Sequence, residues 1–126
     1  MIERNKYTVL IVDDEPDILE LMEEEFNYYG YQTMTADCGV DAIEKIRNNK
    51  FDVVVSDYKM PNGNGMLVLE EVNSMDSSIR PDFFFVSGQA DISIKDALDA
   101  GAKEFFSKPF DLDDLIKVIE KELTLK

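Results

Sequence analysis

The chain has 126 residues, 44% of them hydrophobic, which is enough to bury the core of one domain. It carries 27 acidic and 13 basic residues, and the resulting net charge of −14 repels nucleic-acid phosphate and anionic lipid. No apolar run approaches the roughly 20 residues of a membrane span, and the N-terminus lacks the apolar segment of a signal peptide. We therefore expect one cytoplasmic domain over residues 1–126, with no direct nucleic-acid contact and no membrane insertion.

The use of histidine and cysteine narrows the chemistry further. The chain has no histidine, and its one cysteine, Cys38, excludes an internal disulfide. A zinc site and histidine-based acid–base catalysis are therefore nearly excluded, because the chain lacks the side chains they require. The negative charge does not exclude a hard metal cation, so carboxylates that lie together are the groups of interest.

Strand-like apolar runs alternate with helical patterns five times along the chain. The expected strands are Thr8–Val12, Gln32–Ala36, the valine run that ends at Asp57, Phe83–Val86 and Glu104–Ser107. Strict alternation with short connections is typical of a doubly wound α/β domain, in which helices cover both faces of a parallel sheet. Parallel crossovers are almost always right-handed, so the carboxyl ends of all the strands meet at one edge.

A helix is expected after each strand. The first begins at Pro16, whose missing N–H costs nothing in a first turn, and ends at Gly30. The second helix is expected over Gly39–Asn48. The third is expected to start at Asn64 or Gly65, and the fourth to end at Gly101. The expected N-caps of the second, fourth and fifth helices are Asp37, Asp91 and Asp111. Apolar faces are expected at Val40, Ile43 and Ile46 in the second helix and at Leu112, Leu115, Ile116, Ile119 and Leu123 in the last.

The third strand lies in the stretch 51–61, where three valines end abruptly at Asp57. A continuous apolar run bounded by polar residues is typical of a strand buried on both faces at the centre of a parallel sheet. Open α/β sheets place their sites at the carboxyl ends of such strands. Pro61 and Gly63 enforce a turn soon afterwards, so a plain turn-forming role for Asp57 is the alternative.

The other strand ends decide between these interpretations. The carboxyl edge carries Asp13 and Asp14 after the first strand, Asp57 after the third, Ser87 after the fourth and Lys108 after the fifth. Taken singly, the aspartate pair suits a helix start, and the serine and the lysine suit loops or surface. Four different strand ends together predict one site.

The predicted chemistry follows from charge. Two carboxylates about 4 Å apart repel by on the order of 4 kcal/mol at an effective dielectric constant near 20. Lys108 can offset one carboxylate, and Mg²⁺ with oxygen ligands can offset the others. In such a site Asp57 can attack a phosphoryl group to form an aspartyl phosphate, while Lys108 neutralises the phosphoryl oxygens and Ser87 donates a hydrogen bond to one of them.

The sequence resembles a response-regulator receiver domain of bacterial two-component signalling, in the CheY-like superfamily, from Tyr7 to Leu123. The matching signatures are Val-Asp-Asp-Glu at 12–15, Asp-Tyr-Lys-Met-Pro at 57–61, Val-Ser-Gly at 86–88 and Ala-Gly-Ala-Lys-Glu-Phe-Phe-Ser-Lys-Pro-Phe at 100–110. The resemblance implies a flavodoxin-like (βα)₅ fold with strand order 2-1-3-4-5. It also implies a signalling switch, not an enzyme, that draws phosphate from a phosphohistidine on a sensor histidine kinase or a histidine phosphotransfer protein.

The resemblance also implies a role for each matching residue. The implied roles are Asp57 as phosphoacceptor, Asp14 and Asp13 as ligands of Mg²⁺ (Asp13 directly or through water), Lys59 as a backbone-carbonyl ligand, and Ser87 and Lys108 as phosphoryl-binding residues. Mn²⁺ is an alternative metal. The peptide bond before Pro109 is expected to be cis, as only X-Pro bonds commonly are.

A switch is implied too. Ser87 would move toward the phosphoryl group and Phe105 would turn inward, altering the surface of residues 91–124 for a downstream protein target or output domain. The alternative is that Phe105 is simply an aromatic residue of the strand at the sheet edge, with no part in a switch. We expect Lys59 and Gln89 to tune the lifetime of the aspartyl phosphate by controlling water access; two solvated loop residues are the alternative.

Three competing functions follow from the same topology. A haloacid-dehalogenase-type phosphatase needs a second acid two residues after Asp57, where Lys59 stands. A flavin mononucleotide binder needs a hydroxyl- and glycine-rich loop after the first strand, where this chain has Asp-Asp-Glu. An inert receiver-like module is the third. We expect no output domain within 1–126; a stand-alone regulator, a piece of a longer regulator or hybrid kinase, and dimerisation through 91–124 all stay open.

Overall fold

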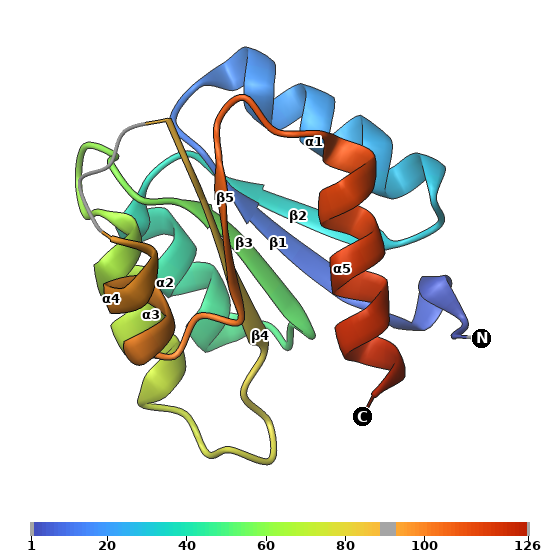
Figure 1. Cartoon of the computed structure of the whole chain (residues 1–126). Coiled ribbons are helices and arrows are strands. Elements are labelled where there is room, and N and C mark those ends of the chain that lie inside the picture. The colour runs from blue at the N-terminus through green and yellow to red at the C-terminus, as the bar shows by residue number, and fades with distance from the viewer. Residues whose placement is uncertain (1, 89–92, 126) are drawn as a thin grey trace.

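Five parallel strands form the centre of the protein, in the order β2-β1-β3-β4-β5. The computed structural model describes residues 2–88 and 93–125. The strands are β1 (Thr8–Val12), β2 (Gln32–Ala36), β3 (Val53–Asp57), β4 (Asp82–Ser87) and β5 (Glu104–Ser107) (Figure 1). The predicted fold class and strand order are confirmed.

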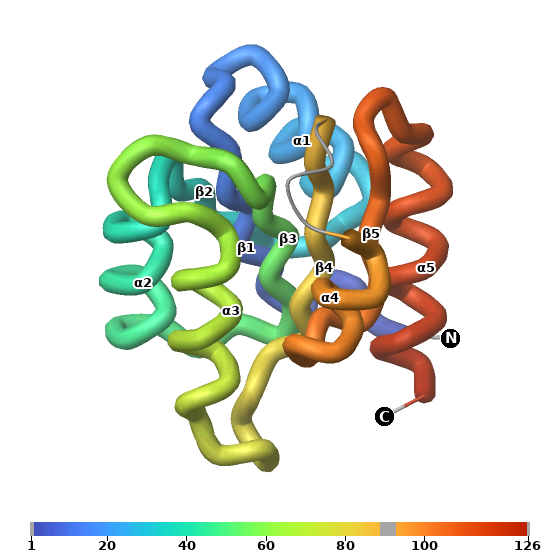
Figure 2. The backbone as a smooth tube through the Cα atoms, turned by 60° about the vertical axis from the view of Figure 1, so that its left-hand side comes forward, coloured from blue at the N-terminus to red at the C-terminus, as the bar shows by residue number. Residues whose placement is uncertain are grey.

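Helices cover both faces of this sheet (Figures 1 and 2). They are α1 (Pro16–Tyr28), α2 (Gly39–Asn48), α3 (Gly65–Asn73), α4 (Ile94–Asp99) and α5 (Leu112–Thr124), preceded by a short 3₁₀ turn at Arg4–Lys6. The apolar faces of α1 and α5 pack on one side of the sheet, and those of α2, α3 and α4 pack on the other. No helix in the described part of the chain is long and apolar enough to cross a bilayer.

The valine run forms β3, and all five of its residues are buried. Because side chains alternate along a strand, Val54 enters the core under α2 and α3, whereas Val53 and Val55 enter the core under α1 and α5. The strand therefore needs apolar residues at successive positions, which is why its sequence shows no alternation.

Two details of the helix predictions are wrong. Cys38, not Asp37, is the N-cap of α2, and its Sγ accepts a hydrogen bond from the amide of Asp41. The buried residues of α2 are Gly39, Ala42 and Ile46, while the side chain of Val40 is 61% exposed. The face of α2 turns in this way because Gly39 packs directly on the backbone of the β3–α3 loop.

The start of α4 also differs from the expectation. Ser93 is the N-cap, and its hydroxyl accepts a hydrogen bond from the amide of Asp96. The expected cap, Asp91, lies outside the described residues. At the other end, Gly101 has a φ of +113°, the left-handed conformation that ends a helix most readily at glycine. Helix α3 begins at Gly65, one of the two predicted starts, and Asn64 is its N-cap. The N-cap of α5 is Asp111, as predicted.

Candidate functional site

The strand register brings the polar strand ends together. Val12 pairs with Ser56, so Asp13 and Asp57 lie side by side where β1 and β3 end. On the other side of β3, Asp57 pairs with Val86 of β4, and Ser87 is the residue after Val86. Ser87 pairs in turn with Ser107 on β5, and the amide of Lys108 donates a hydrogen bond of 2.7 Å to the carbonyl of Ser87.

Two aspartates of the site are buried. Asp13 is fully buried and Asp57 is 6% exposed. Backbone amides hold each carboxylate, because the amide of Glu15 donates to Oδ1 of Asp13 and the amide of Tyr58 donates to Oδ1 of Asp57. Each aspartate keeps a second oxygen, Oδ2, directed to a shared cation.

That cation is the ammonium of Lys108. Its Nζ donates hydrogen bonds of 2.9 Å to Oδ2 of Asp13 and 3.1 Å to Oδ2 of Asp57. A third carboxylate oxygen, Oε1 of Glu15, lies 3.5 Å away. The sequence predicted that Lys108 offsets one carboxylate, whereas in the structure it contacts three. The peptide bond between Lys108 and Pro109 is cis, as expected.

Burial and charge act in opposite directions on these groups. Burial raises the pKa of the Asp57 carboxyl above its ordinary value, and the hydrogen bond and charge of Lys108 offset only part of that rise. Burial lowers the pKa of the Lys108 ammonium, but its hydrogen bonds and ion pairs with Asp13 and Asp57 outweigh burial, so this pKa is raised overall. The lysine is thus held as a cation, and the site has more negative charge than one lysine neutralises.

The excess charge is arranged as a cation site. One carboxylate oxygen from each of Asp13, Asp14, Glu15 and Asp57 lies within 4.8 Å of the others. Oxygen donors of this kind are those that Mg²⁺ and Mn²⁺ prefer, so the donor set fits a hard divalent cation. Glu15 was not predicted as a site residue, although its place directly after the aspartate pair could have indicated it.

A pocket of about 340 Å³ opens beside these carboxylates, and it brings together some of the remaining predicted residues. Its lining includes Asp14, Lys59 and Ser87. Ser87 is buried and Lys59 is exposed. Phe105 lies apart from the pocket, half-buried on β5, with its ring centroid 6.3 Å from that of Phe85. Gln89 is outside the described residues.

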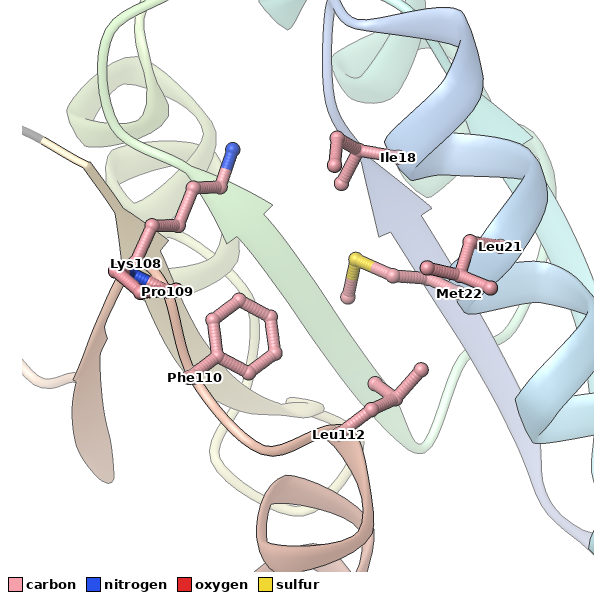
Figure 3. A pocket seen from close by; sticks show the side chains of 7 residues that line it. All are labelled: Ile18, Leu21, Met22, Lys108, Pro109, Phe110 and Leu112. Carbon is pink, nitrogen blue, oxygen red and sulfur yellow. The ribbon is translucent and has the colours of Figure 1, made fainter.

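An apolar groove of about 370 Å³ adjoins the site. Figure 3 shows Ile18, Leu21 and Met22 of α1 on one side, and Lys108, Pro109, Phe110 and Leu112 on the other. Lys108 lines both the groove and the carboxylate pocket. This groove was not predicted from the sequence, because its two walls are almost ninety residues apart in the chain.

Comparison with known proteins identifies the class to which this fold and site belong. Residues 9–120 match the response regulator receiver domain. The chain belongs to this family of two-component signalling proteins, as its sequence motifs indicated.

Individual relatives match over nearly the whole chain. It is 36% identical over 118 residues to sporulation initiation phosphotransferase F of Bacillus subtilis, covering 94% of each chain. It is 32% identical to the chemotaxis protein CheY of the same organism, covering 93% of this chain and 98% of that one. Longer regulators match as well, and the chain spans 27% of a transcriptional regulatory protein, ZraR, of Salmonella typhimurium.

A solved structure shows the same architecture. The response regulator TrrA of Thermotoga maritima, in complex with Mg²⁺ and BeF, superimposes with a TM-score of 0.81 and 30% sequence identity. The match covers 91% of this chain and 97% of TrrA.

Proposed function

We propose that this protein is a phosphoacceptor switch, in which Asp57 receives a phosphoryl group from a phosphohistidine on a sensor histidine kinase or a histidine phosphotransfer protein. The observation that carries the proposal is the pairing of buried Asp57 with Lys108 at 3.1 Å, at the carboxyl edge of the sheet. A structural ion pair needs no pocket, whereas this one opens on a space of about 340 Å³ lined by further carboxylates and by Ser87. The relatives' roles in signalling support the same function.

In the proposed reaction a carboxylate oxygen of Asp57 attacks the phosphorus, an O–P bond forms, and the P–N bond to the partner's imidazole breaks. The electron pair of that bond leaves with the imidazole nitrogen. The ammonium of Lys108 would turn from Oδ2 of Asp57 to the phosphoryl oxygens. The hydroxyl of Ser87 would donate a hydrogen bond to one of these oxygens. Oδ1 of Asp57 is held by the amide of Tyr58, which fixes the orientation of the nucleophile.

The carboxylates of Asp13, Asp14 and Asp57 and the carbonyl of Lys59 would hold Mg²⁺ or Mn²⁺. When bound, the metal supplies positive charge for the phosphoryl oxygens. The complex of TrrA with Mg²⁺ and BeF supports this assignment. Glu15 lies in the same oxygen cluster and would add a further carboxylate to the negative charge that attracts the cation.

The switch that we propose runs from Ser87 to Phe105 and then to the surface of residues 91–124, where a downstream protein or output domain would bind. Phe105 packs against the core under α2, α3 and α4 and contacts Phe85, so an inward turn has apolar surroundings to enter. Phosphorylation shifts this equilibrium only by its differential interaction with the two states. Lys59 and Gln89 would tune phosphate loss, and unchanged decay in both alanine variants would remove them from the proposal.

The groove between α1 and the β5–α5 turn would receive an apolar helix of the phosphodonor. It shares Lys108 with the acceptor site, so a partner seated there stands beside Asp57. The first turns of α1 and α5 carry Asp17, Asp113 and Asp114, so the partner helix should have basic flanks.

The cytoplasmic location and the single-domain extent of 1–126 stay predictions.

The test is labelling with acetyl phosphate, a small phosphodonor. Wild type should take up about one phosphoryl group in Mg²⁺ and none after EDTA treatment, whereas folded Asp57→Asn should take up none. An unlabelled wild type would establish an inert receiver-like module instead. Label that persists in Asp57→Asn would place the acceptor elsewhere.

A further inference from the structure

The β3–α3 loop, residues 58–64, carries Lys59, whose carbonyl is a ligand in the proposed metal site. A loop carbonyl is a useful ligand only if the loop holds one position, because Mg²⁺ demands nearly ideal octahedral geometry. The structure shows what holds this loop, and the inference that follows rests on the proposed function.

One end of the loop is fixed beside Asp57. The amide of Gly65 donates a hydrogen bond of 2.7 Å to the carbonyl of Tyr58, which closes the loop at its base. A Cβ on Gly65 would lie 2.3 Å from the carbonyl oxygen of Asp57, so the start of α3 sits directly on the site. This contact fixes the base but leaves the apex of the loop unsupported.

The apex rests on the N-terminus of α2. The amide of Gly39 donates to the carbonyl of Gly63 at 3.1 Å, and the amide of Val40 donates to the carbonyl of Asn62 at 3.0 Å. These carbonyls accept from amides that have no partner inside the helix. Both loop residues have positive φ, 53° for Asn62 and 99° for Gly63, which turns their carbonyls to α2.

The approach is too close for any side chain. A Cβ on Gly39 would lie 2.3 Å from the carbonyl oxygen of Gly63 and 2.6 Å from its carbonyl carbon. Both are backbone atoms, so no side-chain rotation relieves the clash and the loop apex must move. Nothing within the α2 helix itself requires glycine at this position, because its N-cap is supplied by Cys38.

We propose that Gly39 is a positioning residue for the metal site: its bare backbone supports the loop apex and so sets where the carbonyl of Lys59 lies. The effect is transmitted through Asn62 and Gly63, and Gly39 itself touches no ligand of the metal. In this assignment α2, which contributes no carboxylate to the site, helps to determine metal affinity.

The test compares Gly39→Ala with Gly30→Ala by calorimetric titration with Mg²⁺ alone. Gly30 has a φ of +102° and only the Cβ of Arg4 within contact, at 3.6 Å, so its alanine variant is strained far from the site. Gly39→Ala should bind Mg²⁺ about tenfold more weakly than wild type, the usual effect of disturbing the support of a metal ligand. Gly30→Ala should bind as wild type does.

Titration with Ca²⁺ separates positioning from general loss of stability. Ca²⁺ accepts irregular geometry, so its affinity should fall much less than that of Mg²⁺ in Gly39→Ala. An equal loss for both cations, or Mg²⁺ affinity equal to that of Gly30→Ala, would overturn the inference. If Gly39→Ala does not fold, Gly63→Ala disturbs the same contact from the loop side, because its Cβ would lie 3.3 Å from the Cα of Gly39. Its φ of +99° adds backbone strain like that of Gly30→Ala, so the comparison with that control and the expectations are unchanged.

These outcomes are distinct from failure of the proposed function. A wild type that binds no Mg²⁺ would overturn the metal site itself. A wild type that binds Mg²⁺ beside an unaffected Gly39→Ala would overturn only the role of Gly39.

Discussion

At the scale of single residues, the site combines burial with unbalanced charge. Asp13 and Asp57 are buried and share one lysine, with Asp14 and Glu15 close by. Folding must desolvate these carboxylates and hold them together, and both processes cost free energy. If the site binds a cation and a phosphoryl group as proposed, its crowded carboxylates reduce the stability of the protein when neither is present.

Replacement of Asp57 by asparagine should consequently stabilise the metal-free protein. The change keeps the shape of the side chain, removes a partly desolvated charge, and leaves the Lys108–Asp13 ion pair in place. In EDTA at pH 7, we expect the Tm of Asp57→Asn to exceed that of wild type by about 2–4 °C in a thermal melt. Asp99→Asn, an exposed aspartate on α4, is the control. A Tm below that of wild type would show that the Asp57–Lys108 bond outweighs the cost of burial.

At the scale of elements, α1 and the β5–α5 turn form the groove beside the site. Leu21 lines it and is 54% exposed, so its side chain is available to a partner and contributes little to the core. Leu67 on α3 is a matched leucine, 46% exposed, on the opposite face of the sheet.

Leu21→Ser should therefore slow phosphotransfer from a protein donor but not from a small-molecule donor. With a phosphohistidine-bearing phosphotransfer domain that labels wild type, we expect kcat/KM to fall about tenfold, as for an apolar residue central to an interface. Labelling by acetyl phosphate should not change, because the acceptor site is intact. Leu67→Ser should match wild type with both donors; equal kinetics of the two serine variants would exclude the groove as the docking surface.

Helix α5 is also joined to the N-terminal segment. Arg4 pairs with Glu120 at 2.6 Å and stacks on Tyr29, while the hydroxyl of buried Tyr31 donates to the same glutamate. The hydrogen bond from Arg4 keeps the pKa of the Glu120 carboxyl below its ordinary value. An acid whose pKa is lower in the folded state adds stability above its unfolded pKa, and this stability is lost as pH falls through the folded value.

Stability measured by urea denaturation should reflect this linkage. Between pH 7 and pH 3, wild type should lose more stability than Glu120→Gln, which has no charge to lose at this position. The difference at neutral pH should be below about 1 kcal/mol, because the pair is partly exposed and screened. Glu24→Gln, at an exposed position of α1, should follow wild type. Parallel pH profiles for wild type and Glu120→Gln would contradict the assigned role of the pair.

At the scale of the whole molecule, net charge opposes compactness. A chain with a net charge of −14 repels itself in the folded state, and this repulsion weakens as salt shortens the screening length. In EDTA, raising NaCl from 20 to 500 mM should raise the Tm by about 2–5 °C. Tetramethylammonium chloride, whose cation is too large for the carboxylate site, should give the same rise. A rise with NaCl alone would indicate ion binding at the site and not screening.

Much of this architecture is encoded locally in the sequence. Apolar runs and helix caps predicted the strand bounds Thr8–Val12, Gln32–Ala36 and Glu104–Ser107, because each element's hydrophobic spacing follows from its own geometry. The strand order and the family came from the motifs at the strand ends, and both are confirmed. Since parallel strands end at one edge, the sequence also determined that Asp13, Asp57, Ser87 and Lys108 would meet.

Other features depend on contacts between distant segments, and only the tertiary structure decided them. The three-carboxylate environment of Lys108 includes Glu15, 93 residues away, and no local pattern specifies that distance. The groove has walls from α1 and the β5–α5 turn, and the loop apex meets Gly39 only because α2 and α3 pack side by side. Periodicity reports which face of an element is buried, whereas what that face touches is set by close packing of the whole chain.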